Sequence, residues 1–254
     1  MIPDKSFYVN PQKINDKNFS LDPIESNHLA NVLRLNIGDK IFLLDGIGNG
    51  YVSVIGYLSK YEVHGRIEKQ YNQYGENKSR INLAPAIIKR DRFENLIEKA
   101  VELGVCEIQP LALDHCQKKT INIDRCKKII ISSAKQCRRS FFPVIKEPVN
   151  LETFLKYKKK NCLVGIQNSA NTLNKFMANA MRDVELIIGP EGDFSKKEYL
   201  EFNIKKKIEI KDLRIEIINY LDKNFKENDN FKMIVETSAF CSEDNNIIND
   251  DYII

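Results

Sequence analysis

The sequence lacks tryptophan altogether and has only three histidines among its 254 residues. It also lacks any apolar run near the roughly 20 residues that a membrane-spanning helix needs, and its first residues do not contain the apolar stretch of a secretory signal. These absences argue against a helical membrane protein and against export. We therefore expect a cytoplasmic protein that has no membrane partner.

The six cysteines and three histidines do not form a pattern that would hold a metal ion. No two cysteines have the C-x-x-C spacing, and His28, His64 and His115 lie far apart in the sequence. Zinc and related metals are held by closely spaced ligands of these types. We therefore expect free thiols, used as small buried side chains, and no metal site.

Charge is nearly balanced overall but is unevenly distributed along the chain. There are 39 Lys and Arg against 35 Asp and Glu, which gives a net charge of +4. Residues 116–140 contain eight basic residues and one acidic residue, whereas residues 226–254 contain seven acidic and two basic residues. A basic cluster attracts a phosphate backbone, although a solvated helix face is the commoner reason for one. The acidic tail is typical of a loosely ordered segment.

The first part of the chain has the pattern of a small β barrel. Residues 71–79 are polar, contain no aliphatic side chain and indicate a linker. We therefore expect a β-barrel domain over residues 1–75. The supporting runs are rich in β-branched and aromatic residues and are separated by tight turns: 7–9, 40–45, 50–55 and 61–67.

Beyond residue 75, apolar strand-like runs alternate with runs of helical periodicity. This order indicates an α/β fold with a parallel sheet, which we expect over residues 76–225, followed by a divergent acidic tail at 226–254. The expected strands are 81–88, 105–111, 161–166 and 184–188, and the expected helices are 91–103 and 121–139.

Two glycine-containing segments invite interpretation as ligand-binding loops. Residues 46–50 lead into a strand, whereas a dinucleotide-binding loop opens a helix, so turn glycines with positive φ are the better explanation there. Residues 187–198 run from an apolar strand through Gly-Pro-Glu-Gly to a Ser195-x-x-Glu198 capping box, which begins a helix. Parallel sheets bind ligands beyond the carboxyl ends of their strands. This second loop is therefore either a ligand site or a plain strand-to-helix turn.

Four segments, in this order, resemble motifs of the bacterial RsmE family, whose members methylate N3 of a uridine in 16S ribosomal RNA. The resemblance covers about residues 5–200. The segments are His28-Leu29-Ala30-Asn31-Val32-Leu33-Arg34-Leu35-Asn36-Ile37-Gly38-Asp39; Lys89-Arg90-Asp91-Arg92-Phe93-Glu94 with 99–105; Ala134-Lys135-Gln136-Cys137-Arg138-Arg139 with Pro143; and Ile188-Gly189-Pro190-Glu191-Gly192 with Phe194, Ser195 and Glu198.

The resemblance implies a fold that residue patterns alone do not indicate. It implies an α/β methyltransferase domain of the SPOUT type, tied in a deep trefoil knot and preceded by a PUA-like β barrel that binds RNA. It also implies S-adenosylmethionine as the cofactor, 16S ribosomal RNA in the small ribosomal subunit as the partner, and a homodimer. Knots are rare exceptions to the rules of chain connection.

The resemblance also assigns candidate site residues. The candidate catalytic residues are Arg214 and Arg139, because a guanidinium can stabilise charge on the uracil oxygens. For residues 163–165, plain sheet core is an equally good explanation. The candidate cofactor-binding residues are Leu163, Val164, Gly165, Ile188, Gly189, Pro190, Glu191, Gly192, Lys211, Leu213 and Ile215. The candidate RNA-binding residues are His28, Arg34, Lys89, Arg90, Arg92 and Arg138.

The chain departs from the family where a third cofactor loop is expected, with a pattern of approximately L-G-x-R-I-L-R-x-E-T-A. Residues 210–218 keep Leu213-Arg214 and Glu216, whereas residues 233–239 keep a Glu-Thr pair but come too late in the chain. In addition, Asp193 stands where the family has glycine.

These departures leave two hypotheses. The first is an S-adenosylmethionine-dependent methyltransferase that acts on N3 of a uridine in 16S ribosomal RNA. The second is a catalytically impaired SPOUT-fold RNA-binding protein that has lost cofactor binding. A related SPOUT enzyme that acts on transfer RNA is disfavoured, because residues 28–39 match the barrel of the ribosomal RNA family.

Overall fold

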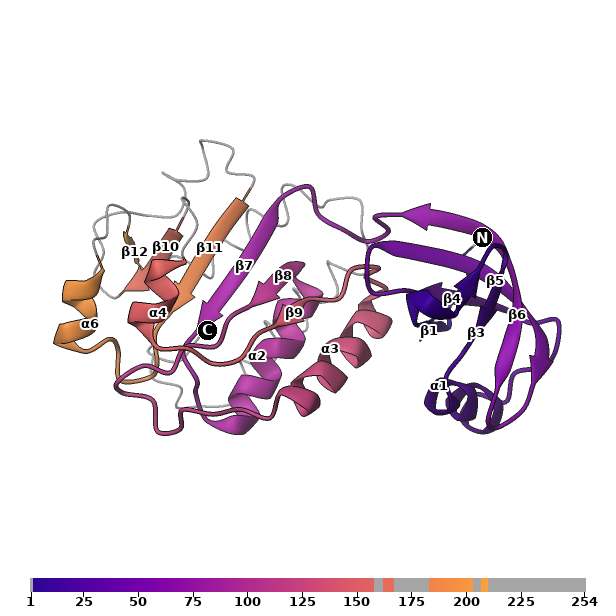
Figure 1. The fold of residues 1–254 in the computed structure, drawn as a ribbon, viewed down its shortest axis with the longest axis horizontal. Helices are drawn as coiled ribbons and strands as arrows, with labels where there is room; N and C mark the ends of the chain where they lie inside the picture. Colours follow the sequence, from indigo (N-terminus) through magenta and orange to yellow (C-terminus); the bar gives the residue numbers. More distant parts are fainter. Residues whose placement is uncertain (1, 158–161, 167–182, 203–206, 210–254) are drawn as a thin grey trace, which may run out of the picture. The chain divides into compact units, whose positions relative to one another are not determined.

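The computed structural model describes residues 2–157, 162–166, 183–202 and 207–209 (Figure 1). The chain divides into two units. Unit 1 consists of Met1–Asn77 and Lys127–Pro143, and unit 2 consists of Lys78–Cys126 and Val144–Ile254. The sequence predicts a single change of domain near residue 75, whereas the structure also returns the segment Lys127–Pro143 to unit 1. The predicted tail at 226–254 lies outside the described residues.

Unit 1 contains a six-stranded sheet in the order β1-β4-β5-β6-β3-β2. β1 pairs with β4 in parallel, and the other pairs are antiparallel. The predicted turn glycines are confirmed: β4 and β5 pair antiparallel, and Gly46 and Gly48 have φ of 77° and 117° in the turn between them. The elements are β1 (Ser6–Tyr8), η1 (Pro11–Lys13), β2 (Ile14–Asn15), β3 (Asn18–Ser20), α1 (Pro23–Asn27), the π-helical turn η2 (His28–Val32), β4 (Lys40–Leu44), β5 (Asn49–Leu58) and β6 (Val63–Asn72).

Strand β4 is buried on both faces, which explains why its sequence is a continuous apolar run rather than an alternating one. Ile41 and Leu43 pack into the main core of unit 1. Phe42 and Leu44 face a second cluster, against which Phe142 packs. The Phe142 N–H also donates to the Gly46 carbonyl at 2.9 Å. The returning segment Lys127–Pro143 therefore helps to cover a face of β4 that solvent would otherwise reach.

Unit 2 contains a second six-stranded sheet, in the order β12-β10-β11-β7-β8-β9, in which every pair is parallel. The prediction of an α/β fold with a parallel sheet is thus confirmed. The elements are β7 (Arg80–Pro85), α2 (Arg90–Glu102), β8 (Val105–Ile108), β9 (Val144–Ile145), α4 (Leu151–Lys156), β10 (Cys162–Ile166), β11 (Asp183–Ile188), α6 (Lys196–Glu201) and β12 (Lys207–Glu209). Helix α3 (Ile123–Cys137) begins in unit 2 and runs into unit 1, since its residues from Lys127 onward belong to that unit.

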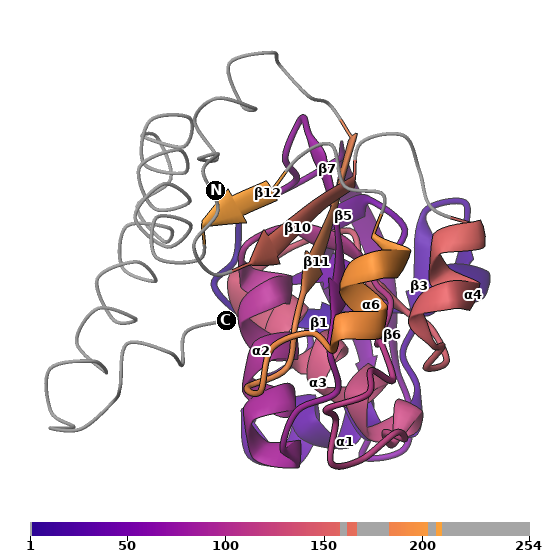
Figure 2. The ribbon, with the colours of Figure 1, turned by 90° about the vertical axis from the view of Figure 1, so that its left-hand side faces the viewer.

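The order of strands reverses direction between β7 and β11. After β7 the chain adds β8 and β9 toward one edge, whereas β11, β10 and β12 lie toward the other edge. Helices α4 and α6 lie on one side of this sheet and α2 on the other (Figure 2). The carboxyl ends of β7 and β11 are joined, since the Ala86 N–H donates to the Ile188 carbonyl at 2.8 Å. A reversal of this kind is where α/β sheets form a ligand crevice.

The described part of the chain has no helix that is long and apolar enough to cross a membrane. Five cysteines fall within the described residues, and none of them forms a disulfide there: Cys106, Cys116, Cys126, Cys137 and Cys162.

Candidate functional site

Two of the predicted cofactor segments meet at neighbouring strand ends in unit 2. Gly165 of β10 is the register partner of Ile188 of β11 in a parallel ladder. Leu163 and Val164 are buried within the sheet, and Val164 belongs to its hydrophobic core. The structure therefore brings residues 163–165 beside the loop that starts at Gly189, with Gly165 nearest to that loop.

The loop that follows β11 is shaped by its own aromatic packing. A Cβ atom at Gly189 would lie 2.9 Å from the Phe194 ring, which is closer than real side-chain contacts, so the buried ring requires glycine at this position. The Asp193 N–H donates to the Pro190 carbonyl at 3.0 Å and closes a turn. These two contacts give the Gly-Pro-Glu-Gly loop a defined conformation.

Asp193 explains one departure from the resembled family. Its φ is 61°, a left-handed conformation that glycine adopts without strain and that Asp tolerates better than most residues do. Its carboxylate accepts a hydrogen bond from the Tyr199 hydroxyl at 2.8 Å. Burial, together with this carboxylate, raises the pKa of Tyr199 above its ordinary value. The Asp193 side chain therefore joins the loop to α6, which a glycine could not do.

The segment after β8 tethers the same loop through His115. Nδ1 of His115 donates to the carbonyls of Gly192 and Asp193, at 3.0 and 2.8 Å. The carbonyl of Asp193, followed by that of Gly192, raises the pKa of this imidazole. Sequence reasoning missed this role because it considered the histidines only as metal ligands. The available signal was an Asp-His pair shortly after an apolar strand.

Asp114 and the capping box complete the loop's support. The predicted box is confirmed, with Ser195 and Glu198 bonded to each other's backbone at the start of α6. The Ser195 hydroxyl also donates to Asp114 Oδ2 at 2.6 Å, and the Asp114 N–H donates to Glu198 Oε1 at 2.8 Å. The pKa of Asp114 is lowered by the Ser195 hydroxyl. Three polar side chains thus connect the end of the loop to the segment after β8.

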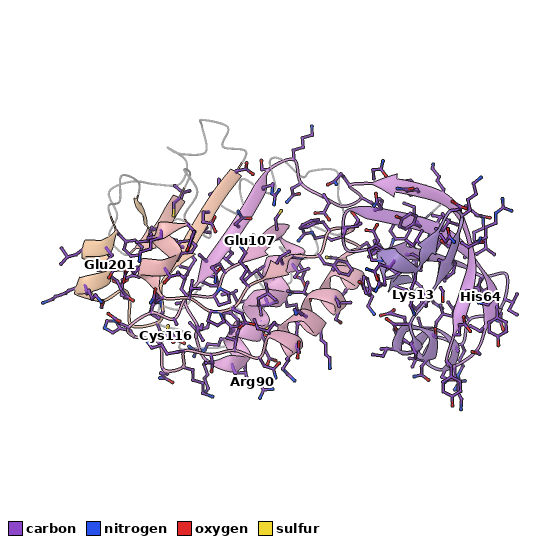
Figure 3. The ribbon with its side chains drawn as sticks, in the orientation of Figure 1. Lys13, His64, Arg90, Glu107, Cys116 and Glu201 are labelled. Carbon is purple, nitrogen blue, oxygen red and sulfur yellow. The ribbon has the colours of Figure 1, made fainter. Side chains whose placement is uncertain are left out.

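The first turn of α2 brings the predicted basic residues to this edge of the sheet. Arg92 Nη1 lies 2.6 Å from Glu191 Oε1, so a predicted RNA-binding residue contacts a predicted cofactor-binding residue. Arg90 lies on the outside of unit 2 at the start of α2 (Figure 3), and its Nε donates to Glu94 Oε1 at 2.9 Å. Lys89 precedes α2 as an exposed N-terminal cap.

Glu94 is shared by two arginines. Arg125 contacts both of its carboxylate oxygens, at 2.5 and 2.7 Å, in addition to the contact from Arg90. The Arg125 hydrogen bonds, followed by that of Arg90, lower the pKa of Glu94 to about 2. Asp91 also acts electrostatically on Arg125, so the excess of one positive charge arises when the exposed Lys89 is counted with Arg90 and Arg125, and it suits an anionic ligand.

The remaining predicted RNA-binding residues belong to unit 1. The half-buried His28 packs edge-on against Phe7, with ring centroids 6.0 Å apart. Arg34 is exposed and has a φ of 52°. Arg138 Nη2 donates to the Asp4 carbonyl at 2.8 Å.

Arg139, a predicted catalytic residue, is buried in unit 1. Its side chain is 3% exposed and that of its partner Glu76 is 7% exposed, with Nη2 and Oε2 2.8 Å apart. Glu76 also accepts a hydrogen bond from the Phe141 N–H at 2.9 Å. This ion pair fastens the returning segment to the end of the first segment of unit 1. Arg139 therefore has a structural role in unit 1, and its catalytic role stays a prediction.

Several predicted site residues lie outside the described residues, and their roles stay predictions: Arg214, Lys211, Leu213 and Ile215. Within the described part of the chain, no three His, Cys, Asp or Glu side chains are grouped so that they could hold a metal ion.

Comparison with known proteins gives two family models that follow one another along the chain. An RNA methyltransferase domain matches residues 75–217, and an RNA methyltransferase PUA domain matches residues 21–68. The ribosomal RNA small subunit methyltransferase E of Rickettsia conorii is 30% identical over 178 residues, which is 68% of this chain and 71% of the relative.

Solved structures agree with these models. A methyltransferase from Legionella pneumophila in complex with the bound cofactor SAM is 30% identical, with a TM-score of 0.70, over 78% of this chain and 85% of the other. The ribosomal RNA small subunit methyltransferase E of Neisseria gonorrhoeae, bound to S-adenosyl methionine, covers 82% of this chain and 88% of its own. It is 24% identical with a TM-score of 0.71, which supports the fold.

Proposed function

This chain belongs to the RNA methyltransferase family that includes the ribosomal RNA small subunit methyltransferase E proteins, and we propose that it methylates N3 of a uridine in 16S ribosomal RNA, with S-adenosylmethionine as the methyl donor. The substrate would be RNA within the small ribosomal subunit, in the cytoplasm. The proposal includes a trefoil knot in unit 2 and a homodimer, as the resemblance to the family implies.

The observation that carries the proposal is the position of the Gly189–Asp193 loop. It begins at the carboxyl end of β11, beside Gly165 of β10 and next to β7, where the order of strands reverses. The basic residues at the start of α2 follow the neighbouring strand β7 in the chain. The point where the strand order reverses and the basic start of α2 therefore lie at one edge of one sheet, a position that suits a small cofactor and a phosphate-bearing substrate.

The loop offers hydrogen-bond donors that fit this cofactor. The N–H groups of Glu191 and Gly192 have no hydrogen-bond acceptor among the described residues, and both residues are exposed. Such donors can bind the ring nitrogens or the carboxylate of S-adenosylmethionine. Gly192 carries no side chain, so a ligand can approach the backbone there closely. A Cβ added at this position would lie 3.6 Å from His115, an ordinary contact. Leu163–Gly165 and Ile188–Gly192 are the described residues that would hold the cofactor.

The reaction requires three things of the protein. When bound, S-adenosylmethionine supplies an activated methyl group. The chain's residues must place uridine N3 in line with it, stabilise the negative charge that builds on the uracil oxygens when the N3 proton leaves, and exclude water. We assign the charge-stabilising role to Arg214 ahead of Arg139, because the Arg139 guanidinium is committed to the buried Glu76.

The RNA would be bound by residues from both units. Lys89 and Arg90 at the start of α2 would contact phosphates near this edge of the sheet, where they and Arg125 exceed the carboxylates of Glu94 and Asp91 by one charge. His28 and Arg34, on a segment within the matched PUA region, would contact RNA farther along. Phosphate contacts position the substrate, and the pocket around the uracil ring would provide selectivity.

A direct test uses small ribosomal subunits from a strain that lacks the modification. The purified chain is incubated with these subunits and methyl-labelled S-adenosylmethionine, and a curated relative serves as the active control. We expect label in 16S RNA and 3-methyluridine in the nucleoside digest. Label in another nucleoside would overturn the assignment to N3. No label, while the control is active, would overturn methyltransferase activity.

Calorimetry with S-adenosylmethionine distinguishes the alternative hypothesis of an RNA-binding protein without activity. Submillimolar binding of the cofactor supports the enzyme. No binding, together with retained binding of 16S RNA, supports the impaired form.

A further inference from the structure

An ion pair lies at the edge of the sheet where the strand order reverses. Arg92 is in the first turn of α2, which follows β7. Glu191 is in the loop that connects β11 to α6. Their Nη1 and Oε1 atoms are 2.6 Å apart. Because α2 and α6 lie on opposite sides of the sheet (Figure 2), this contact connects structure on one side to structure on the other.

Glu191 differs from the other residues of its loop in where its partner comes from. The carbonyls of Gly192 and Asp193 are held by His115, and the Asp193 side chain is held by Tyr199 of the following helix. Glu191 is held by Arg92, ninety-nine residues earlier in the chain. Within the described part of the chain, no other hydrogen bond or ion pair ties the Glu191 side chain. The pair with Arg92 is therefore what holds this end of the loop toward α2.

The charges around Arg92 indicate that it is not primarily a phosphate ligand. Its guanidinium faces the Glu191 carboxylate, so the pair is close to neutral and Glu191 would repel an approaching phosphate. The positive excess lies instead with Lys89, Arg90 and Arg125, which exceed the carboxylates of Glu94 and Asp91 by one charge. RNA is attracted to that excess, whereas Arg92 is committed to the loop.

We propose that Arg92 is a positioning residue for the cofactor: through its ion pair with Glu191, it holds the Gly-Pro-Glu-Gly loop in the conformation that binds S-adenosylmethionine. This inference rests on the proposed function. The interaction is partly exposed, with the Arg92 and Glu191 side chains 55% and 33% exposed. Its removal therefore weakens cofactor binding by a modest factor, about two- to fivefold, without unfolding the protein.

The experiment compares Arg92→Gln, Glu191→Gln, the double variant and Arg92→Lys by steady-state kinetics and calorimetry. We expect both single variants to raise the KM and Kd for S-adenosylmethionine about two- to fivefold, with kcat little changed. The reason is that the loop would bind the cofactor equally in the ground state and in the transition state. The double variant should be no worse than either single variant, and Arg92→Lys should restore most of the affinity. Lys99→Gln is the control, since it removes one positive charge from the same helix, where Lys99 pairs with Glu102.

Salt dependence of RNA binding provides the opposing outcome. If Arg92 is instead a phosphate ligand, Arg92→Gln lowers the slope of log affinity against log salt by about one, leaves the cofactor KM unchanged, and Glu191→Gln strengthens RNA binding. That pattern would overturn the proposal. Equal effects of Lys99→Gln and Arg92→Gln on the cofactor KM would also overturn it. If the unaltered protein binds no cofactor at all, the proposed function fails rather than the assignment of Arg92 within it.

Discussion

Each unit contains an arginine–glutamate pair of similar geometry in a very different environment. In unit 1, Arg139 and Glu76 approach to 2.8 Å with side chains 3% and 7% exposed. In unit 2, Arg92 and Glu191 approach to 2.6 Å with both side chains partly exposed. Loss of one partner leaves a buried charge without a counterion in the first pair, whereas water screens the remaining charge in the second pair. Burial, rather than distance, therefore separates a pair that holds the fold from a pair that can adjust a site.

The same contrast extends to the segments around each pair. The returning segment Lys127–Pro143 is packed into the second core cluster of unit 1 through Phe142. The loop after β11 is held in large part by hydrogen bonds that His115 and Tyr199 donate and by one that Asp114 accepts from Ser195. A segment held by apolar packing is difficult to move, whereas one held by exposed polar contacts can respond to a ligand.

The largest expected effect follows from breaking the buried pair. Arg139→Met leaves the Glu76 carboxylate buried without its cation, and we expect the free energy of unfolding of unit 1 to fall by about 3–5 kcal/mol. Urea unfolding followed by the tyrosine fluorescence of unit 1 measures this loss. Adding Glu76→Gln should recover part of it, because no charge is then buried and the Phe141 N–H keeps an acceptor.

Arg138→Met is the matched control for that change. Arg138 is the neighbouring arginine, and the Asp4 side chain with which it pairs is 98% exposed. We expect less than about 1 kcal/mol of destabilisation. Equal losses for the Arg138 and Arg139 variants would contradict the distinction by burial.

An intermediate effect is expected where the loop of unit 2 does depend on packing. Gly189→Ala would place a Cβ 2.9 Å from the Phe194 ring, and we expect a loss of about 1–3 kcal/mol in the stability of unit 2. Gly192→Ala is the control, because its Cβ would lie 3.6 Å from His115, an ordinary contact. Urea unfolding followed by circular dichroism compares the two variants. If the Gly192 variant loses as much stability as the Gly189 variant, the ring of Phe194 is not the cause.

The smallest effect concerns the half-buried carboxylate of Glu94. Its pKa is lowered to about 2 in the folded protein, so the stabilisation it contributes is present above its ordinary pKa of 4.5 and is lost as the pH falls through about 2. NMR titration of the Glu94 carboxyl should show a midpoint near pH 2. Arg125→Gln should move the midpoint toward 4.5, because the Arg125 hydrogen bonds are the largest cause of the shift.

Arg92→Gln provides the comparison for the titration. It removes a charge from the same turn of α2 but not a partner of Glu94, so the midpoint should stay near that of the unaltered protein. A midpoint near 4.5 in the unaltered protein would show that the two arginines do not hold this carboxylate.

Local features of the fold could be predicted because neighbouring residues determine them. The turn glycines Gly46 and Gly48 have positive φ, and the Ser195–Glu198 box satisfies N–H groups of its own helix. Short elements such as β9 and α4 were not predicted, since two and six residues are too few to establish a periodicity. The support of the loop by Asp114 and His115 was missed for another reason. Their partners lie nearly eighty residues away, at sequence separations of 77 to 84.

The alternation of strands and helices in unit 2, the apolar runs of the buried strands and the motifs that mark the family can all be recognised in the amino-acid sequence. These depend on the chemistry of side chains close together in the chain. The role of each basic residue, in contrast, depends on how distant segments pack. Arg139 and Arg92 are both arginines in motif segments, yet one is buried against Glu76 and the other reaches Glu191 across the sheet. Partner and burial set the energy of a charge, and both arise only when distant segments pack together.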